Sequence, residues 1–138
     1  MSRENVELVL RALAAAVRRP KPDFGIVNTL FHKDHLLLGT LQHDLAEAPI
    51  QGGSGYREFL ADDAMRWETD VESAVDVGPN TVLAVGRTKY VGGASGVKEE
   101  RRMWCVVSVA DGKVARTEVF FDPAKALAAA LEAVGLRE

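Results

Sequence analysis

A histidine followed by a carboxylate is the pair in this chain best suited to chemistry near neutral pH. His43 precedes Asp44, and a carboxylate can orient an imidazole that takes up and releases a proton. His43 is therefore the candidate acid/base, with Asp44 as its partner. Successive residues of a strand point to opposite faces, so the two cooperate only if a loop holds them. The competing interpretation is a solvent-exposed or structural histidine.

The remaining reactive side chains give weaker signals. His32 and His35 flank Lys33 and Asp34 where a short helix should end, which predicts surface positions for both histidines. The three histidines include no pair at i, i+4 on a helix with a third ligand in view, so no metal site is predicted. No cofactor is expected either. Cys105, the one cysteine, has no histidine near it in sequence and is expected to be a small buried hydrophobe.

The elements that must position these residues follow from apolar periodicity and from turn residues. Helical spacing predicts helices, and alternation with period two predicts strands. Asp111–Gly112 is a strong two-residue hairpin signal, and Asp122 should cap a helix that begins at Pro123. The expected order is a helix over 3–18, a short helix over 24–31, a strand around 36–38, a helix over about 54–66, four antiparallel strands from 67 to 121, and a closing helix that ends near 135.

A meander of strands with helices collected against it is an α+β arrangement. The length of 138 residues and a hydrophobic content of 47% fit one domain with a single core, spanning residues 1–138. The 17 basic and 20 acidic residues are spread along the chain and give a net charge of -3, so no basic stripe is available for nucleic acid.

Neither a membrane segment nor a secretory signal is expected. No apolar run approaches the roughly 20 residues that cross a bilayer. The start MSRENVEL is polar and acidic, whereas a secretory signal begins with basic residues and an apolar core. A single cysteine cannot form an internal disulfide. These features together predict a soluble cytoplasmic protein.

The strand 102–109 is apolar on both faces, because Met103, Cys105, Val107 and Val109 alternate with Trp104 and Val106. An antiparallel strand with water on one side would be apolar on one face only. Helices can cover one face, and a second copy of the chain is the simplest cover for the other. A homodimer is therefore expected.

The strand 81–91 suggests a cavity by the sizes of its side chains. Ala84, Gly86 and Thr88 follow one another on one face, ahead of Tyr90, and three small residues leave space where a core is normally filled. The alternative is that a bulky neighbour such as Trp104 packs over them.

Arg102 ends the charged run 98–102, which is either a solvated strand end or the rim of a pocket mouth.

Four segments together resemble the SnoaL-like polyketide cyclase family of the nuclear transport factor 2-like superfamily. They are SRENVELVLRALAAAV at 2–17, ESAVDVGPNTVLAVGR at 72–87, GASGVKEE at 93–100 and DGKVARTEVFFDPAKALAAALEAVGL at 111–136. The resemblance implies a cone-shaped α+β domain, in which a curved antiparallel sheet wraps around N-terminal helices. It also implies a pocket on the concave face and, in many members, a dimer through the convex face.

The resemblance, with a face count back from Asp111–Gly112, predicts which residues line the pocket. The convex face should then hold Cys105, Val107, Arg116, Glu118 and Phe120, with Leu83 and Val85, and Glu118 should pair with Arg116 or Arg87. The expected ligand-binding residues are Ala84, Gly86, Thr88, Tyr90, Arg102, Trp104, Val106, Thr117, Val119 and Phe121.

The family contains cyclases, isomerases, hydrolases and proteins with no known activity, so the fold leaves the reaction open. The aspartate, tyrosine and acid of its steroid isomerases match approximately Gly39 or Thr40, Leu13 or Ala14, and Trp104 here. The arginine-carboxylate set of its epoxide hydrolases is broken at Trp104. The first hypothesis is a domain that binds a small hydrophobic molecule in an apolar pocket. The alternatives are an isomerase, cyclase or hydrolase with His43 as acid/base, and a module that presents its sheet to another protein.

Overall fold

Four helices and six strands make up the described part of the chain. The computed structural model describes residues 2–18, 21–39, 48–61, 67–92 and 97–135. The elements are α1 (Ser2–Val17), α2 (Phe24–Leu30), β1 (Phe31–Leu38), β2 (Ile50–Gln51), α4 (Gly52–Ala61), β3 (Trp67–Gly78), β4 (Thr81–Gly92), β5 (Val97–Ala110), β6 (Lys113–Phe120) and α5 (Pro123–Ala133). None of the described helices is long and apolar enough to cross a membrane.

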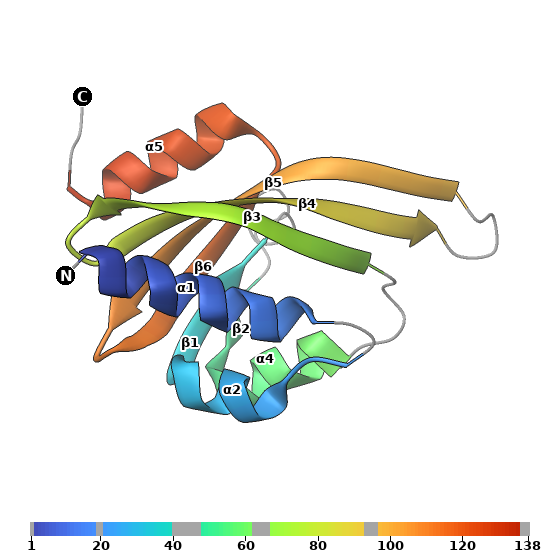
Figure 1. The fold of residues 1–138 in the computed structure, drawn as a ribbon, viewed down its shortest axis with the longest axis horizontal. Coiled ribbons are helices and arrows are strands. Elements are labelled where there is room, and N and C mark those ends of the chain that lie inside the picture. Colours follow the sequence, from blue (N-terminus) through green and yellow to red (C-terminus); the bar gives the residue numbers. More distant parts are fainter. Residues whose placement is uncertain (1, 19–20, 40–47, 62–66, 93–96, 136–138) are drawn as a thin grey trace.

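The six strands form one curved sheet in the order β2-β1-β6-β5-β4-β3 (Figure 1). The expected antiparallel meander of β3 to β6 is confirmed. Its last hairpin turns at Asp111 and Gly112, whose φ angles are 55° and 70°. β1 then pairs in parallel with β6, which places a strand from the first third of the chain beside the last strand. β3 is left as one edge of the sheet.

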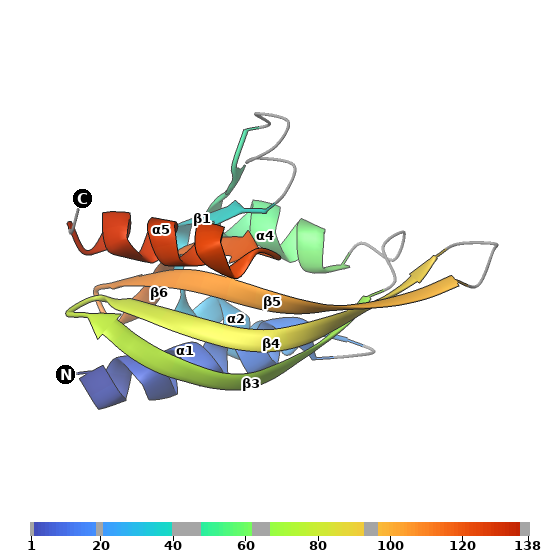
Figure 2. The ribbon, with the colours of Figure 1, turned by 90° about the horizontal axis from the view of Figure 1, so that it is seen from above.

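Helices cover both sides of this sheet (Figures 1 and 2). α1, α2 and α4 lie on the concave side, where α1 packs mainly on β3 and α4 mainly on β1. α5 lies on the opposite side across β4, β5 and β6. Its start is fixed by Asp122, whose Oδ1 accepts a hydrogen bond from the Ala124 N–H at 2.9 Å, as the sequence predicted. The expected α+β class with a curved sheet is confirmed.

Two separate hydrophobic clusters fill the two sides. The larger joins α1, α2 and α4 to the concave face and includes Val9, Leu13, Val82, Ala84, Cys105 and Val107. The smaller joins α5 to the other face and includes Val106, Phe120, Ala126 and Ala130, with Leu83 and Trp104 at its margin. Both faces of β5 are thus covered within one chain, so its two apolar faces do not require a second copy.

A β-bulge in β6 reverses part of the predicted face assignment. Val109 pairs with Val114, but Ser108 pairs with Arg116, so Ala115 is an extra residue that places Thr117 opposite Val107. An unbroken count from the turn pairs Thr117 with Val106, and therefore puts the wrong face of β5 inward. The prediction was wrong for Trp104 and Val106, which pack toward α5, and for Cys105 and Val107, which belong to the hydrophobic cluster on the concave side.

The structure also gives a different reason from the predicted one for a glycine at position 86. Gly86 pairs with Val71 beside a second bulge, at Glu72, and a Cβ placed on it would collide with the backbone carbonyl oxygen of Asp70. The glycine therefore permits close approach of β3 to β4. The expectation that it leaves space for a ligand was wrong.

Candidate functional site

The concave side contains a buried polar cluster around His35 of β1. His35 is 0% exposed, and its Nε2 lies 2.9 Å from Thr117 Oγ1 on β6. Its ring lies 5.0 Å from the ring of Phe31 and 4.7 Å from that of Tyr56, which α4 supplies. We call His35, Thr117, Phe31 and Tyr56 the His35 cluster.

Burial controls the protonation state of this histidine. Desolvation lowers the pKa of His35 from 6.5 to about 4, so the imidazole is neutral near pH 7. Its Nδ1 is buried and has no hydrogen-bond partner among the described residues. A neutral imidazole carries one N–H and one lone pair, so one of the two must occupy this unpartnered position.

The expected surface position of His35 was wrong, because β1 begins at Phe31 and not near Leu36. His35 and Leu37 alternate with exposed or half-buried neighbours and face the core. That short alternation was the available signal, but the strand itself depends on pairing with β6, some 80 residues away. His32 is half-buried and lies 3.9 Å from Asp34 Oδ2 and 3.7 Å from Asp111 Oδ2.

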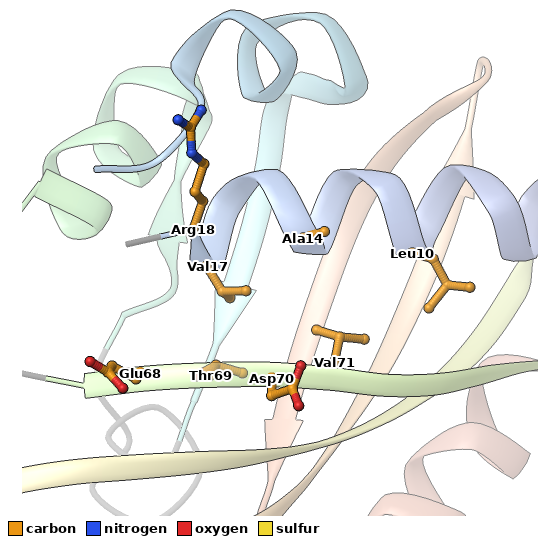
Figure 3. A pocket seen from close by; sticks show the side chains of 8 residues that line it. All are labelled: Leu10, Ala14, Val17, Arg18, Glu68, Thr69, Asp70 and Val71. Carbon is orange, nitrogen blue, oxygen red and sulfur yellow. The ribbon is translucent and has the colours of Figure 1, made fainter. Parts of the chain in front are cut away.

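A second candidate site is an open groove of about 650 Å³ between α1 and β3. Figure 3 shows Leu10 and Val17 of α1 and Val71 of β3 pointing into the space between the two elements. Arg18 extends away from β3, and its Nη1 lies 3.8 Å from Asp23 Oδ2. We call this the α1–β3 groove. Its lining residues are Leu10, Ala14, Val17, Arg18, Glu68, Thr69, Asp70 and Val71.

Hydrogen-bonded side chains support the β3 wall of the groove from behind. Thr69 Oγ1 lies 2.9 Å from Thr88 Oγ1, and the Thr88 hydroxyl lies 3.4 Å from Met103 Sδ. Thr88 is 3% exposed, so it belongs to the wall and not to the open surface. Sequence reasoning missed the groove, although Leu10, Ala14 and Val17 recur at helical spacing beside the core stripe of α1.

The structure brings together only part of the predicted ligand-binding set. Ala84, Thr117 and Val119 belong to the concave side, and Thr117 contacts His35. Arg102 does not reach the concave side, because it is exposed and its Nη2 lies 3.5 Å from Glu72 Oε1. Phe121 follows β6 and lies under the guanidinium of Arg101, 5.0 Å from ring centroid to Cζ.

Other predicted site residues lie outside the described part of the chain. His43 and Asp44 fall in the range 40–47, and of Tyr90 only the backbone is described. Their assignments stay predictions.

The remaining reactive groups have structural roles. Cys105 is buried as predicted, and burial raises the pKa of its thiol to about 12, which suppresses the reactive thiolate. The Glu118 carboxylate pairs with Arg116 Nε at 3.1 Å, as expected. The described residues include no group of three His, Cys, Asp or Glu side chains that could hold a metal ion.

Comparison with solved structures identifies the fold. A putative SnoaL-like polyketide cyclase from Jannaschia sp. CCS1 is 18% identical, with a TM-score of 0.70 over 99% of this chain and 95% of that one. An LEH-like epoxide hydrolase of M. tuberculosis is also 18% identical, with a TM-score of 0.67 over 98% and 92%. A hypothetical protein from Catenulispora acidiphila DSM 44928, with a ketosteroid isomerase-like fold and in complex with trimethylamine, is 16% identical, with a TM-score of 0.66 over 95% and 94%.

A scan against family models and a search of curated proteins found no match to the sequence. At these identities the structural likeness establishes the fold alone. The chain has the cone-shaped nuclear transport factor 2-like fold that SnoaL-like cyclases share, as the four sequence segments indicated.

Proposed function

We propose that this protein binds a small, mainly apolar molecule in the α1–β3 groove. The observation that carries the proposal is the groove itself, whose volume of about 650 Å³ falls within the roughly 300–1,000 Å³ that is usual for ligand pockets. Leu10, Val17 and Val71 offer apolar surface to a ligand. Glu68, Thr69 and Asp70 place polar groups along the β3 side, and Arg18 adds a charged group at the end of α1.

The similar structures support a role with small molecules. They include a putative polyketide cyclase, an epoxide hydrolase and a protein in complex with trimethylamine. Each of these descriptions refers to a small organic molecule. Because a shared fold hosts many functions, they support a class of ligand and no particular reaction.

Binding is better supported than proton-transfer catalysis. An isomerase, cyclase or hydrolase with His43 as acid/base remains the alternative, but His43 lies outside the described residues. The one fully buried histidine in the described part, His35, has a pKa of about 4. A general base works best when its pKa lies near the operating pH, so His35 is a weak base at pH 7.

The groove is tested by filling it from α1. Ala14 lines the groove and is exposed, so Ala14→Phe should leave the fold intact and occupy the site. The neutral apolar dye N-phenyl-1-naphthylamine is the probe, followed by fluorescence titration. We expect the dye to bind the parent protein and Ala14→Phe to raise its Kd about tenfold or more, equivalent to about 1.4 kcal/mol.

The matched control is Ala128→Phe, which changes another exposed helical alanine, on α5 across the sheet from the groove. This variant should bind the dye like the parent. Equal dye binding by Ala14→Phe and the parent, or no dye binding by the parent, would rule out the groove as the ligand site.

A homodimer through the convex face stays part of the proposal. The side of the sheet that carries α5 presents Val75 and Leu127, which are 51% and 57% exposed. Beyond α5 this face carries Arg87 and Arg102, which both pair with Glu72 within the chain. Sedimentation at micromolar concentration tests the assembly, and a monomer there would remove it.

A further inference from the structure

The unpartnered Nδ1 of His35 points to a second binding site, separate from the α1–β3 groove. We infer that this atom accepts a hydrogen bond from the O–H group of a small neutral guest held within the His35 cluster. The His35 side chain is 0% exposed, and its other ring nitrogen is already bonded to Thr117. Native proteins seldom leave a buried polar atom unpaired, since its desolvation costs about 1–3 kcal/mol.

The tautomer follows from the two ring positions. If Nδ1 carried the proton, a buried N–H would have no acceptor among the described residues. If Nε2 carries it, the N–H donates to Thr117 Oγ1 at 2.9 Å, and only a lone pair is left at Nδ1. A buried N–H without an acceptor is rarer than an under-used acceptor, so the second arrangement is favoured. His35 therefore offers an acceptor, and the guest must supply a donor.

The surroundings select a neutral guest, and any part of an organic guest beyond its O–H group must be apolar or aromatic. The rings of Phe31 and Tyr56 lie within 5.0 Å of the imidazole, and both residues are at least 95% buried. Lys33 and Asp34 of β1 and Glu58 of α4 are exposed. Arg116 and Glu118, which flank Thr117 on β6, pair with each other at 3.1 Å. Among the side chains that the structure describes, none offers a charged guest an unpaired counter-charge beside Nδ1, and burying an unpaired charge costs far more than burying a hydroxyl.

The site is reached most simply through α4, which supplies Tyr56. α4 packs mainly on β1 and β2 at one edge of the sheet, and β2 has only two residues. Elements with few long-range contacts open at lower free energy than the core of a sheet. The α1–β3 groove lies at the opposite edge of the same sheet, so the two sites can be tested independently.

Nuclear magnetic resonance of ¹⁵N-labelled histidine rings tests the inference directly. The probes are phenol, which carries an O–H donor, and toluene, which has nearly the same shape without one. The expected spectrum shows His35 as the Nε2–H tautomer with Nδ1 hydrogen-bonded, and His32, half-buried and beside two carboxylates, is the internal reference. A pair of probes is needed because the O–H can come from water or from an organic guest.

The outcomes separate these two sources. An Nδ1 signal that is hydrogen-bonded before any addition, and unchanged by phenol, assigns the site to a bound water molecule. A signal that changes with phenol but not with toluene assigns it to the hydroxyl of an organic guest. A bare Nδ1 in every sample, or an Nδ1–H tautomer, overturns the inference.

Thr117→Val gives a second reading of the same site. It keeps the shape of the side chain and removes the hydroxyl that fixes Nε2, so His35 should show both tautomers and lose its selectivity for phenol over toluene. A single Nε2–H tautomer in this variant would contradict the role given to Thr117. Neither result depends on dye binding in the α1–β3 groove.

Discussion

The His35 cluster and the α1–β3 groove lie at opposite edges of one sheet and differ in how they are closed. In the cluster, Phe31, Tyr56 and His35 are at most 5% exposed, and the polar atom is sealed among rings. In the groove, Leu10, Val17 and Val71 are half-buried beside exposed Glu68 and Asp70. The same fold thus encloses one candidate site within its core and leaves the other on its surface. Changes in the first should affect stability, whereas changes in the second should affect binding.

The largest expected effect comes from emptying the closed site. Phe31 is 4% exposed and contacts both His35 and Tyr56, so Phe31→Ala should lower the free energy of unfolding by about 3–5 kcal/mol. Val71→Ala in the groove wall should cost about 1 kcal/mol, because Val71 is only half-buried. Urea unfolding measures both. Equal losses of unfolding free energy in the two variants would show that the His35 cluster is no more tightly packed than the groove wall.

The next effect is a pH dependence of the free energy of unfolding, which His35 in the closed cluster should cause. The pKa of His35 is about 4 in the folded protein and 6.5 in an unfolded chain. Between these values the unfolded state binds the extra proton, so stability is complete above pH 6.5 and falls as the pH drops toward 4. The loss should reach roughly 3 kcal/mol.

His35→Leu isolates this contribution from the carboxylates that titrate in the same range. The difference in unfolding free energy between the parent and His35→Leu should change across pH 6.5 to 4 and stay constant above pH 7. A difference that does not vary with pH would mean that His35 titrates normally in the folded protein.

The two regions also differ in what their sequences reveal. The strands β3 to β6 follow from local signals, because alternation and the turn at Asp111–Gly112 are encoded by neighbouring residues. The bulge at Ala115 has no such signal, since it is defined by which residue of β5 each residue of β6 meets. One inserted residue was enough to exchange Trp104 for Cys105 on the concave side.

Both candidate sites depend on contacts between distant segments, which explains why sequence reasoning did not find them. β1 exists because it pairs with β6, and that pairing turns His35 inward. The α1–β3 groove depends on the approach of a helix to a strand that begins 50 residues later. The residue types were visible in the sequence, but their neighbours were not.

The smallest expected effect concerns α4, the proposed entrance to the His35 cluster. Gly55 lies inside α4 next to Tyr56, and a Cβ there would meet only the Ile50 side chain at an ordinary 3.7 Å. Gly55→Ala should therefore stabilise the protein by about 0.5–1 kcal/mol through helix propensity. Ala128→Gly makes the reverse change at an exposed position of α5. It should destabilise the protein by a similar amount, which gives a reference value for the effect of Gly55→Ala.

Hydrogen exchange then distinguishes an entrance from a helix that is merely stabilised. If the His35 cluster opens by movement of α4, Gly55→Ala should slow exchange of the β1 amides and leave that of the β3 amides beside the groove unchanged, because α4 packs on β1 and β2 and local opening of α4 leaves β3 covered. Uniform slowing at both edges would show that the sheet opens as one unit. In that case the guest would have to enter the His35 cluster by global unfolding. The two edges of the sheet would then open together, and α4 would not be a separate entrance.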